Sequence, residues 1–343
     1  FILGRQPAIG RAELESLFGG NHIATLTERA VASSVPFEDV PFARLGGAVR
    51  VAKPLAEITT TKWPEIAHYL EKELPKLLKD LPEEGKVKLG LSTFGLPVNA
   101  RQLLRTGLDL KKICKAHGRS MRLVPNEETE LSSAQVLHNQ LTGTLGIELL
   151  LVQNGPKTWL AQTVAVQDIN AYAKRDQGRP KRDARVGMLP PKLAQIIVNL
   201  ATGPLPPSPE HIVLDPFCGT GVVLQEASLA GYGVYGTDLE PRMIEFTTHN
   251  LNWLTDLQNA VTISALEAGD ATEHQWQPGF AVVACETYLG RPLSSWPKPE
   301  TLQDIINTCN LIVEKFMRNI GSQIPSGFRL CLGVPAWQAP DGR

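Results

Sequence analysis

Residues 212–221 read IVLDPFCGTG and set the pattern of the C-terminal half. An apolar run, typical of a buried strand, ends at the acidic Asp215. A loop with Gly219 and Gly221 follows, and a helical pattern then begins at Val222. Glycine lets a backbone pass close to a bulky ligand with positive φ, and a helix amino terminus attracts anionic groups. The stretch therefore predicts a strand–loop–helix unit that holds a ligand where the strand ends.

Strand-like runs and helical patterns alternate from residue 211 onward. Strands are expected at 212–215, 234–238, 261–266, 281–285 and 328–334, with helices at 221–230, 241–254 and 302–317 between them. This alternation predicts a parallel sheet covered by helices on both faces, which is a Rossmann-like α/β fold. Ligands of such sheets bind at the carboxyl ends of the strands.

The glycine loop lacks the GxGxxG spacing of dinucleotide-binding folds, because Val222, Val223 and Leu224 follow Gly221. The order Asp-Pro-Phe-x-Gly-x-Gly instead resembles the class I S-adenosylmethionine (SAM) methyltransferases. That resemblance implies that Asp215 meets the amino group of the cofactor and that Phe217 shapes its pocket.

Further residues fit the same resemblance. Asp238 ends the second strand, where a carboxylate can accept both ribose hydroxyls. The resemblance implies that Leu239 and Met243 flank the adenine and that Asp270 accepts its amine. Upstream, the GMLPP run with Pro190 would line the methionine end of the cofactor, although Pro190 also suits a helix start.

A chain of 343 residues is long enough for about two domains. Residues 1–55 and residues 56–168 each read as a small α+β unit, because strand-like alternation and helical periods are mixed in both. Residues 169–186 are polar, basic and marked by proline, as in a linker. Residues 187–343 carry the alternating strand–helix pattern.

The net charge of −1 argues against a strongly nucleic-acid-binding protein, but the basic residues are concentrated in two segments. Residues 99–125 hold seven Lys or Arg against one acid, and residues 171–192 hold seven against two. Local basic patches attract phosphates whatever the global charge, although two solvated basic faces would give the same pattern. The candidate nucleic-acid contacts are Arg101, Arg105, Lys111, Lys112, Lys115, Arg175 and Arg179.

The cysteines and the apolar runs exclude several classes of protein. Five scattered cysteines without a CxxC predict neither a disulfide scaffold nor a zinc site, so we expect no metal and a reducing, cytoplasmic location. The apolar runs, such as residues 280–285, are far shorter than the roughly 20 residues of a membrane helix.

Several stretches together resemble the THUMP-domain RNA methyltransferases, in particular those that methylate the exocyclic amine of guanosine 10 in tRNA. They are FILGRQPAIGRAELESLFG at residues 1–19, RLGGAVRVAKPL at 44–55, SSAQVLHNQL at 132–141, the basic run with GMLPP at 171–194, and IVLDPFCGTG. The resemblance implies a ferredoxin-like unit over 1–55, a THUMP RNA-binding domain over 56–168, and a Rossmann-like methyltransferase domain over 187–343.

One motif departs from that family. Amino-directed methyltransferases carry [DN]-P-P-[YF] after the fourth strand, where an acceptor binds the amine and a ring stacks on the extruded base. Residues 285–290 here read CETYLG. Either Glu286 takes the acid position, with Gly290 matching a following glycine, or Cys285 takes it and Tyr288 matches the aromatic. We expect Glu286 as acceptor and Tyr288 as stacking ring.

The leading hypothesis is a SAM-dependent methyltransferase of a guanosine amine in tRNA. The rival hypotheses are a non-catalytic SAM- and RNA-binding module, which the degenerate loop favours, and a DNA amino-methyltransferase, which the missing DPPY disfavours. The expected partners are tRNA and, as an open alternative, a small protein, with no membrane.

The number of strands suggests an incomplete sheet. A class I methyltransferase sheet has seven strands, whereas only five are predicted here and nine residues follow Val334. The chain also begins without Met. We therefore expect it to end before the last hairpin of the methyltransferase sheet.

Binding of tRNA should depend steeply on salt if the basic segments neutralise phosphates. The logarithm of affinity should fall against log salt by roughly 0.7–0.9 for each phosphate contact. Filter-binding titrations over a salt series measure this slope, and a flat dependence would mean that the two segments are only solvated faces.

Overall fold

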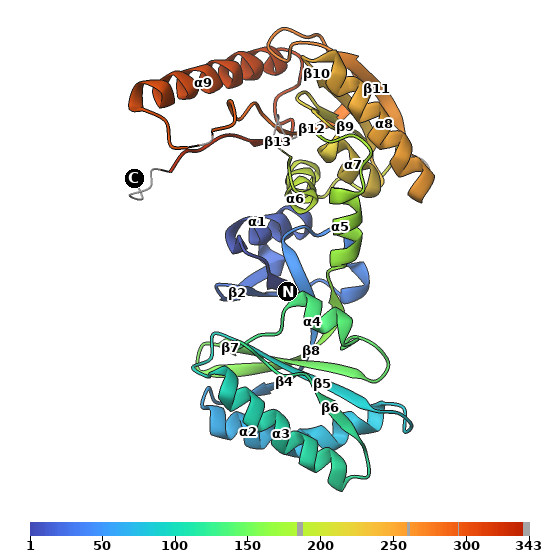
Figure 1. The fold of residues 1–343 in the computed structure, drawn as a ribbon, viewed down its shortest axis with the longest axis vertical. Helices are drawn as coiled ribbons and strands as arrows, with labels where there is room; N and C mark the ends of the chain where they lie inside the picture. Colours follow the sequence, from blue (N-terminus) through green and yellow to red (C-terminus); the bar gives the residue numbers. More distant parts are fainter. Residues whose placement is uncertain (184–187, 259–260, 294, 339–343) are drawn as a thin grey trace. The chain divides into compact units, whose positions relative to one another are not determined.

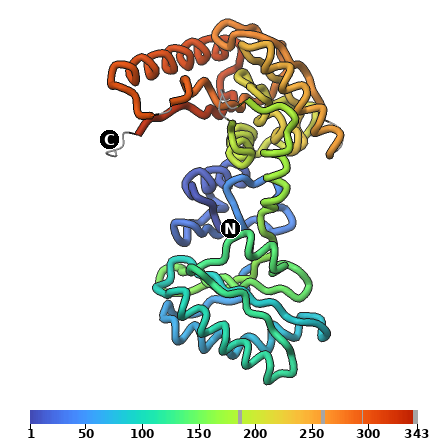
Figure 2. Tube along the Cα trace, viewed as in Figure 1, coloured from blue at the N-terminus to red at the C-terminus, as the bar shows by residue number. Residues whose placement is uncertain are grey.

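The computed structural model describes residues 1–183, 188–258, 261–293 and 295–338, which are coloured in Figure 2. Two compact units divide the chain. The first comprises residues 1–43 and 47–170, and the second comprises residues 44–46 and 171–343. Gly187, at the predicted start of the methyltransferase domain, lies outside the described residues.

The first unit is built on one eight-stranded sheet in the order β2-β3-β1-β4-β8-β7-β5-β6. The strands are β1 (Ile2–Leu3), β2 (Ile23–Thr27), β3 (Ala30–Ser33), β4 (Ala48–Ile58), β5 (Val87–Phe94), β6 (Met121–Leu123), β7 (Gly146–Asn154) and β8 (Lys157–Val166). Strand β5 pairs parallel with β6 and β7, whereas the other pairs are antiparallel. The long β4–β8 pairing makes the sheet continuous across residues 55 and 56, where we placed a boundary between two units.

The helices of this unit are α1 (Pro7–Phe18), α2 (Trp63–Leu77), α3 (Ala100–Ala116) and α4 (Ser133–His138). Helices α2 and α3 lie side by side along the sheet (Figure 1) and bury leucines such as Leu70, Leu103 and Leu110 in one core with its strands. Helix α3 begins after Asn99, whose side chain caps it by accepting a hydrogen bond from Gln102 N, 3.0 Å away.

A buried ion pair joins the middle strands of the sheet. Arg50 on β4 donates to Glu148 on β7 over 3.0 Å, and both side chains are at most 2% exposed. Glu148 also accepts hydrogen bonds from Ser92 on β5 and Thr163 on β8, 2.7 and 2.6 Å away. Four strands from both halves of the unit thus share one carboxylate, whose burial is compensated by three donors.

The second unit contains a five-stranded parallel sheet in the order β11-β10-β9-β12-β13. Its strands are β9 (Ile212–Asp215), β10 (Gly233–Asp238), β11 (Ile263–Ala268), β12 (Phe280–Glu286) and β13 (Leu330–Gly333). All four pairings are parallel, so the predicted Rossmann-like arrangement is confirmed. The strand order changes direction at β9, which is the switch point where ligands bind in such sheets.

The helices of the second unit are α5 (Ile169–Gln177), α6 (Pro191–Thr202), α7 (Val222–Leu229), α8 (Pro241–Gln258) and α9 (Pro299–Gly321). Helices α6 and α7 pack with β9 and β12 in one apolar core, and α9 contributes Phe316 and Ile320 to a second core. Helix α5 occupies the first half of the segment predicted as a linker. No helix in the described ranges is long and apolar enough to cross a membrane.

Breaking the buried pair should destabilise the first unit strongly. Arg50→Met leaves the Glu148 carboxylate buried without its cation, which costs about 3–5 kcal/mol of unfolding free energy. Lys76→Met is the matched control, because Lys76 is 70% exposed and its surface pair with Glu73 adds little to stability. Urea melts followed by tryptophan fluorescence measure both, and equal midpoints for the two variants would contradict the assignment.

Candidate active site at the carboxyl edge of the parallel sheet

A cavity of about 760 Å³ opens at the carboxyl ends of β9, β10 and β12. This volume lies in the upper part of the range of small-molecule sites. Four sequence segments supply most of its wall, namely the glycine loop, the end of β10, the end of β11, and the loop that follows β12. The helix α9 adds Thr308, Leu311, Ile312 and Lys315. The cavity therefore lies where the parallel sheet predicts a ligand.

Three aspartates at the strand ends adopt the same local geometry. In each case one carboxylate oxygen accepts a hydrogen bond from the backbone N–H two residues later, over 2.9–3.1 Å. These aspartates are Asp215, Asp238 and Asp270. Because backbone donors hold each carboxylate, the three side chains are oriented along the cavity wall before any ligand arrives.

The glycine loop is fixed by the end of the neighbouring strand. Gly219 N donates to Asp238 Oδ2 over 2.9 Å, so the first two sheet strands are joined through the loop. Gly219 and Gly221 have φ of 51° and 82°, the left-handed region that favours glycine. A Cβ on Gly221 would also lie 2.9 Å from the Thr247 side chain. Gly221 precedes α7 as its N-cap and does not line the cavity, whereas Gly219 does.

Burial changes the electrostatics of the carboxylates. Asp215 is 2% exposed, and desolvation raises its pKa well above its usual value, with Asp238 and Glu286 adding to the effect. Desolvation also raises the pKa of Asp238 and of Glu286. An anionic cavity edge of this kind favours a cationic ligand.

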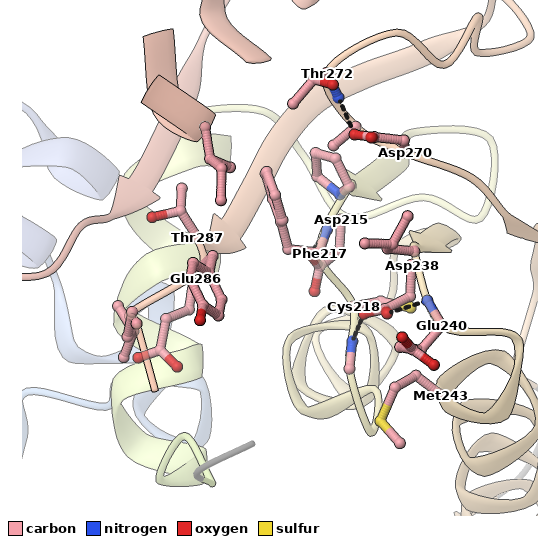
Figure 3. Close-up of a pocket in the computed structure, with 18 of the residues that line it drawn as sticks. Asp215, Phe217, Cys218, Asp238, Glu240, Met243, Asp270, Thr272, Glu286 and Thr287 are labelled. Atoms are coloured by element: carbon pink, nitrogen blue, oxygen red, sulfur yellow. Dashed lines mark hydrogen bonds between the residues drawn. The ribbon is translucent and has the colours of Figure 1, made fainter. Parts of the chain in front are cut away.

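The loop after β12 supplies the far wall of the cavity. Glu286 and Thr287 lie on one side of Phe217, and Asp238, Glu240 and Met243 lie on the other (Figure 3). Thr287 is anchored, because its N and Oγ1 both donate to Gly333 O over 2.8 and 2.9 Å. Cys285 is fully buried in the sheet and does not line the cavity, whereas Glu286 and the 42% exposed Tyr288 do. This placement favours the register with Glu286 as acceptor.

The remaining predicted residues fall into two groups. Leu239 lines the cavity and is 66% exposed, and Phe217 lines it with its ring packed edge-on against Phe316. Pro190 instead is the N-cap of α6, and it is its neighbour Leu189 that lines the cavity. Sequence reasoning missed Glu240, Arg291 and Lys315. Glu240 could have been found from its position two residues beyond the strand-end acid.

The predicted basic contacts also separate into two groups. Exposed positions along α3 carry five of them, namely Arg101, Arg105, Lys111, Lys112 and Lys115. Arg175 instead pairs with the buried Glu226 on α7 over 2.8 Å, and Arg179 is 4% exposed. The side chains of Arg175 and Arg179 are only 12% and 1% exposed, which does not favour the expectation that they contact RNA.

Replacing Asp215 by Asn should stabilise the protein at neutral pH. The raised pKa means that the folded state holds the proton more tightly, so Asp215 lowers stability progressively as pH rises from 3.8, its ordinary pKa, through the raised folded-state pKa. Each unit of elevation corresponds to about 1.4 kcal/mol. Asn still accepts from Phe217 N without the buried charge.

Thermal melts over a pH series test this expectation. The melting temperature of Asp215→Asn should exceed that of the wild type at pH 7, and the gap should shrink as the pH falls. Asp256→Asn, at an exposed position of α8, is the control and should change little. A gap that widens toward low pH would contradict the raised pKa.

Comparisons with known proteins agree with this geometry. Residues 179–286 match the family model of the RMKL-like methyltransferase domain. The chain is 29% identical over 161 residues to the tRNA (guanine(10)-N2)-dimethyltransferase of Methanocaldococcus jannaschii, covering 47% of this chain and 41% of that protein. It is 30% identical over 126 residues to the enzyme of the same name from Pyrococcus abyssi, covering 36% and 34%. The matched segments thus span less than half of these relatives.

The fold of the whole chain also has a solved counterpart. The crystal structure of TrmN from Thermus thermophilus superposes with a TM-score of 0.53 at 17% identity, covering 96% of this chain and 86% of that one. At this identity the likeness concerns the fold alone. Residues 179–286 are thus similar to the RMKL-like methyltransferase domain.

Proposed function

We propose that the protein is a SAM-dependent tRNA methyltransferase that acts on the exocyclic amine of a guanosine. The observation that carries the proposal is the single cavity wall that joins the glycine loop, the strand-end acids and Glu286. The names of the archaeal relatives support the choice of tRNA and of the guanine amine. The first unit would then contain the predicted THUMP domain, with its exposed α3 cations as tRNA contacts.

The volume of the cavity and the charge of its wall suit SAM. Its wall contains Asp215, Asp238, Glu240, Asp270 and Glu286 against two cations, Arg291 and Lys315. SAM has a sulfonium, an ammonium and a carboxylate, so its net charge is positive and complements this wall. Asp215 would bind the ammonium, Asp238 with Glu240 the ribose hydroxyls, and Asp270 the adenine amine. Because Gly219 has no side chain, a bulky ligand can approach the backbone of the glycine loop closely.

The bound cofactor would supply an electrophilic methyl group. The amine of guanine is a weak nucleophile because its lone pair is delocalised into the ring. Glu286 would accept a hydrogen bond from this amine, hold it in line and take its proton as the new bond forms. Burial raises the pKa of Glu286, which makes its carboxylate a better proton acceptor. Tyr288, half-exposed at the cavity mouth, would stack on the extruded base.

Methyl transfer from tritiated SAM to bulk unmodified tRNA tests the proposal. We expect incorporation by the wild type and N2-methylated guanosine after nuclease digestion. Glu286→Gln should lower the rate by roughly 10²–10⁴-fold, because the amide cannot take the proton, while SAM binding by calorimetry is retained. Asp238→Ala should instead weaken SAM binding by roughly tenfold or more.

The rival hypothesis of a non-catalytic protein predicts different results in the same assays. A non-catalytic SAM- and RNA-binding protein would bind both ligands without incorporating tritium. Incorporation into a pyrimidine or into DNA would exclude the guanosine amine as the target. Equal activity of Glu286→Gln and wild type would remove the assigned role of Glu286.

A further inference from the structure

Helix α8 contacts the glycine loop through two side chains. Thr247 Oγ1 donates to Gly219 O over 2.8 Å, and Asn250 Nδ2 donates to Thr220 O over 2.8 Å. Residues three apart lie on the same face of a helix. The carbonyls of Gly219 and Thr220 therefore accept hydrogen bonds from one face of α8. The N–H of Gly219 donates instead to Asp238.

Asn250 also holds a second segment. Its Nδ2 donates to Lys181 O and its Oδ1 accepts from Lys181 N, both over 3.0 Å. Asn250 is fully buried and Thr247 is fully buried beside it. One amide thus makes three hydrogen bonds, two as donor and one as acceptor, to main-chain groups of segments that lie far apart in sequence.

The chemistry of the side chain explains why an amide occupies this position. The carbonyls of Thr220 and Lys181 require two donors and the Lys181 N–H requires an acceptor. Only the amide of Asn or Gln offers two donors and an acceptor on one terminal group. Aspartate has no donor when ionised. Leucine matches Asn in size and offers neither, so it would leave buried main-chain groups without partners.

We propose that Asn250, together with Thr247, is a positioning residue for the glycine loop. It sets the orientation of the peptide groups at Gly219 and Thr220, and it ties that loop to the chain segment 179–183, which leads into the cavity-lining Leu189. Asn250 does not line the cavity itself. The inference rests on the proposed function, because its affinity test uses S-adenosylhomocysteine, the product that remains when the proposed cofactor has given up its methyl group.

Two variants and a matched control test the proposal in the full chain. Asn250→Leu removes all three hydrogen bonds. Thr247→Val keeps the shape of the side chain and removes its hydrogen bond to Gly219 O, together with the weaker one to Cys218 Sγ at 3.9 Å. Asn252→Leu is the control, because Asn252 is an exposed residue of the same type on the same helix. The readouts are hydrogen exchange of the free protein and calorimetric affinity for S-adenosylhomocysteine.

We expect amide exchange to become faster in residues 218–224 and 179–183 for Asn250→Leu, and in residues 218–224 alone for Thr247→Val. Affinity should fall by about tenfold in each, and Asn252→Leu should match the wild type. Where Asn250→Leu does not fold, Thr247→Val decides. A purely structural role predicts faster exchange throughout β10 and β12, and that result, or an unchanged loop, would overturn the proposal.

The two proposals fail in different ways. If the wild type does not bind S-adenosylhomocysteine, the proposed function is wrong, whereas the exchange pattern of the free protein still decides the role of Asn250. If the wild type binds it and the variants bind equally well, the proposed function stands and the positioning role is wrong.

Discussion

Parallel pairing of β9, β10 and β12 is the constraint on which the candidate site depends. In a parallel sheet all carboxyl ends lie at one edge, so residues from distant parts of the chain meet there. Asp215, Asp238 and Glu286 each end a strand of this sheet. Burial desolvates each of these carboxylates, and desolvation is the chief cause that raises the pKa of each. The same burial that costs stability in the free protein favours a positively charged ligand.

Rigid main-chain contacts hold this edge in place. Asp215 and Asp270 each use one oxygen on a backbone N–H, Asp238 uses both of its oxygens in this way, and α8 holds the carbonyls of the glycine loop. Such contacts leave few side-chain torsions to be ordered when a ligand binds, which lowers the entropic cost of binding. The opposite wall, with Tyr288 and Leu289, is more exposed. The cavity thus combines one side held by main-chain contacts with a second side that is more exposed to solvent.

The first unit depends on a buried ion pair inside its sheet. Four of its eight strands are joined by a buried ion pair whose carboxylate has three donors. A buried charge with all its partners fixes the register of the strands around it, since a slipped strand would leave that charge unpaired. Outside this sheet, α3 presents cations to solvent at positions that a folded core does not need. Stability and surface charge are therefore carried by separate faces of this unit.

The amino-acid sequence alone determined the parallel sheet, its five strands, the glycine loop and the acids at the strand ends, because these depend on local periodicity and on short-range spacing. It could not decide between Cys285 and Glu286, since only the pleat of β12 buries one side chain and turns the other to the cavity. It also could not show that Arg175 pairs with the buried Glu226 on α7, or that Asn250 holds the loop. Those contacts join residues roughly 30 to 70 positions apart, and only tertiary packing brings them together.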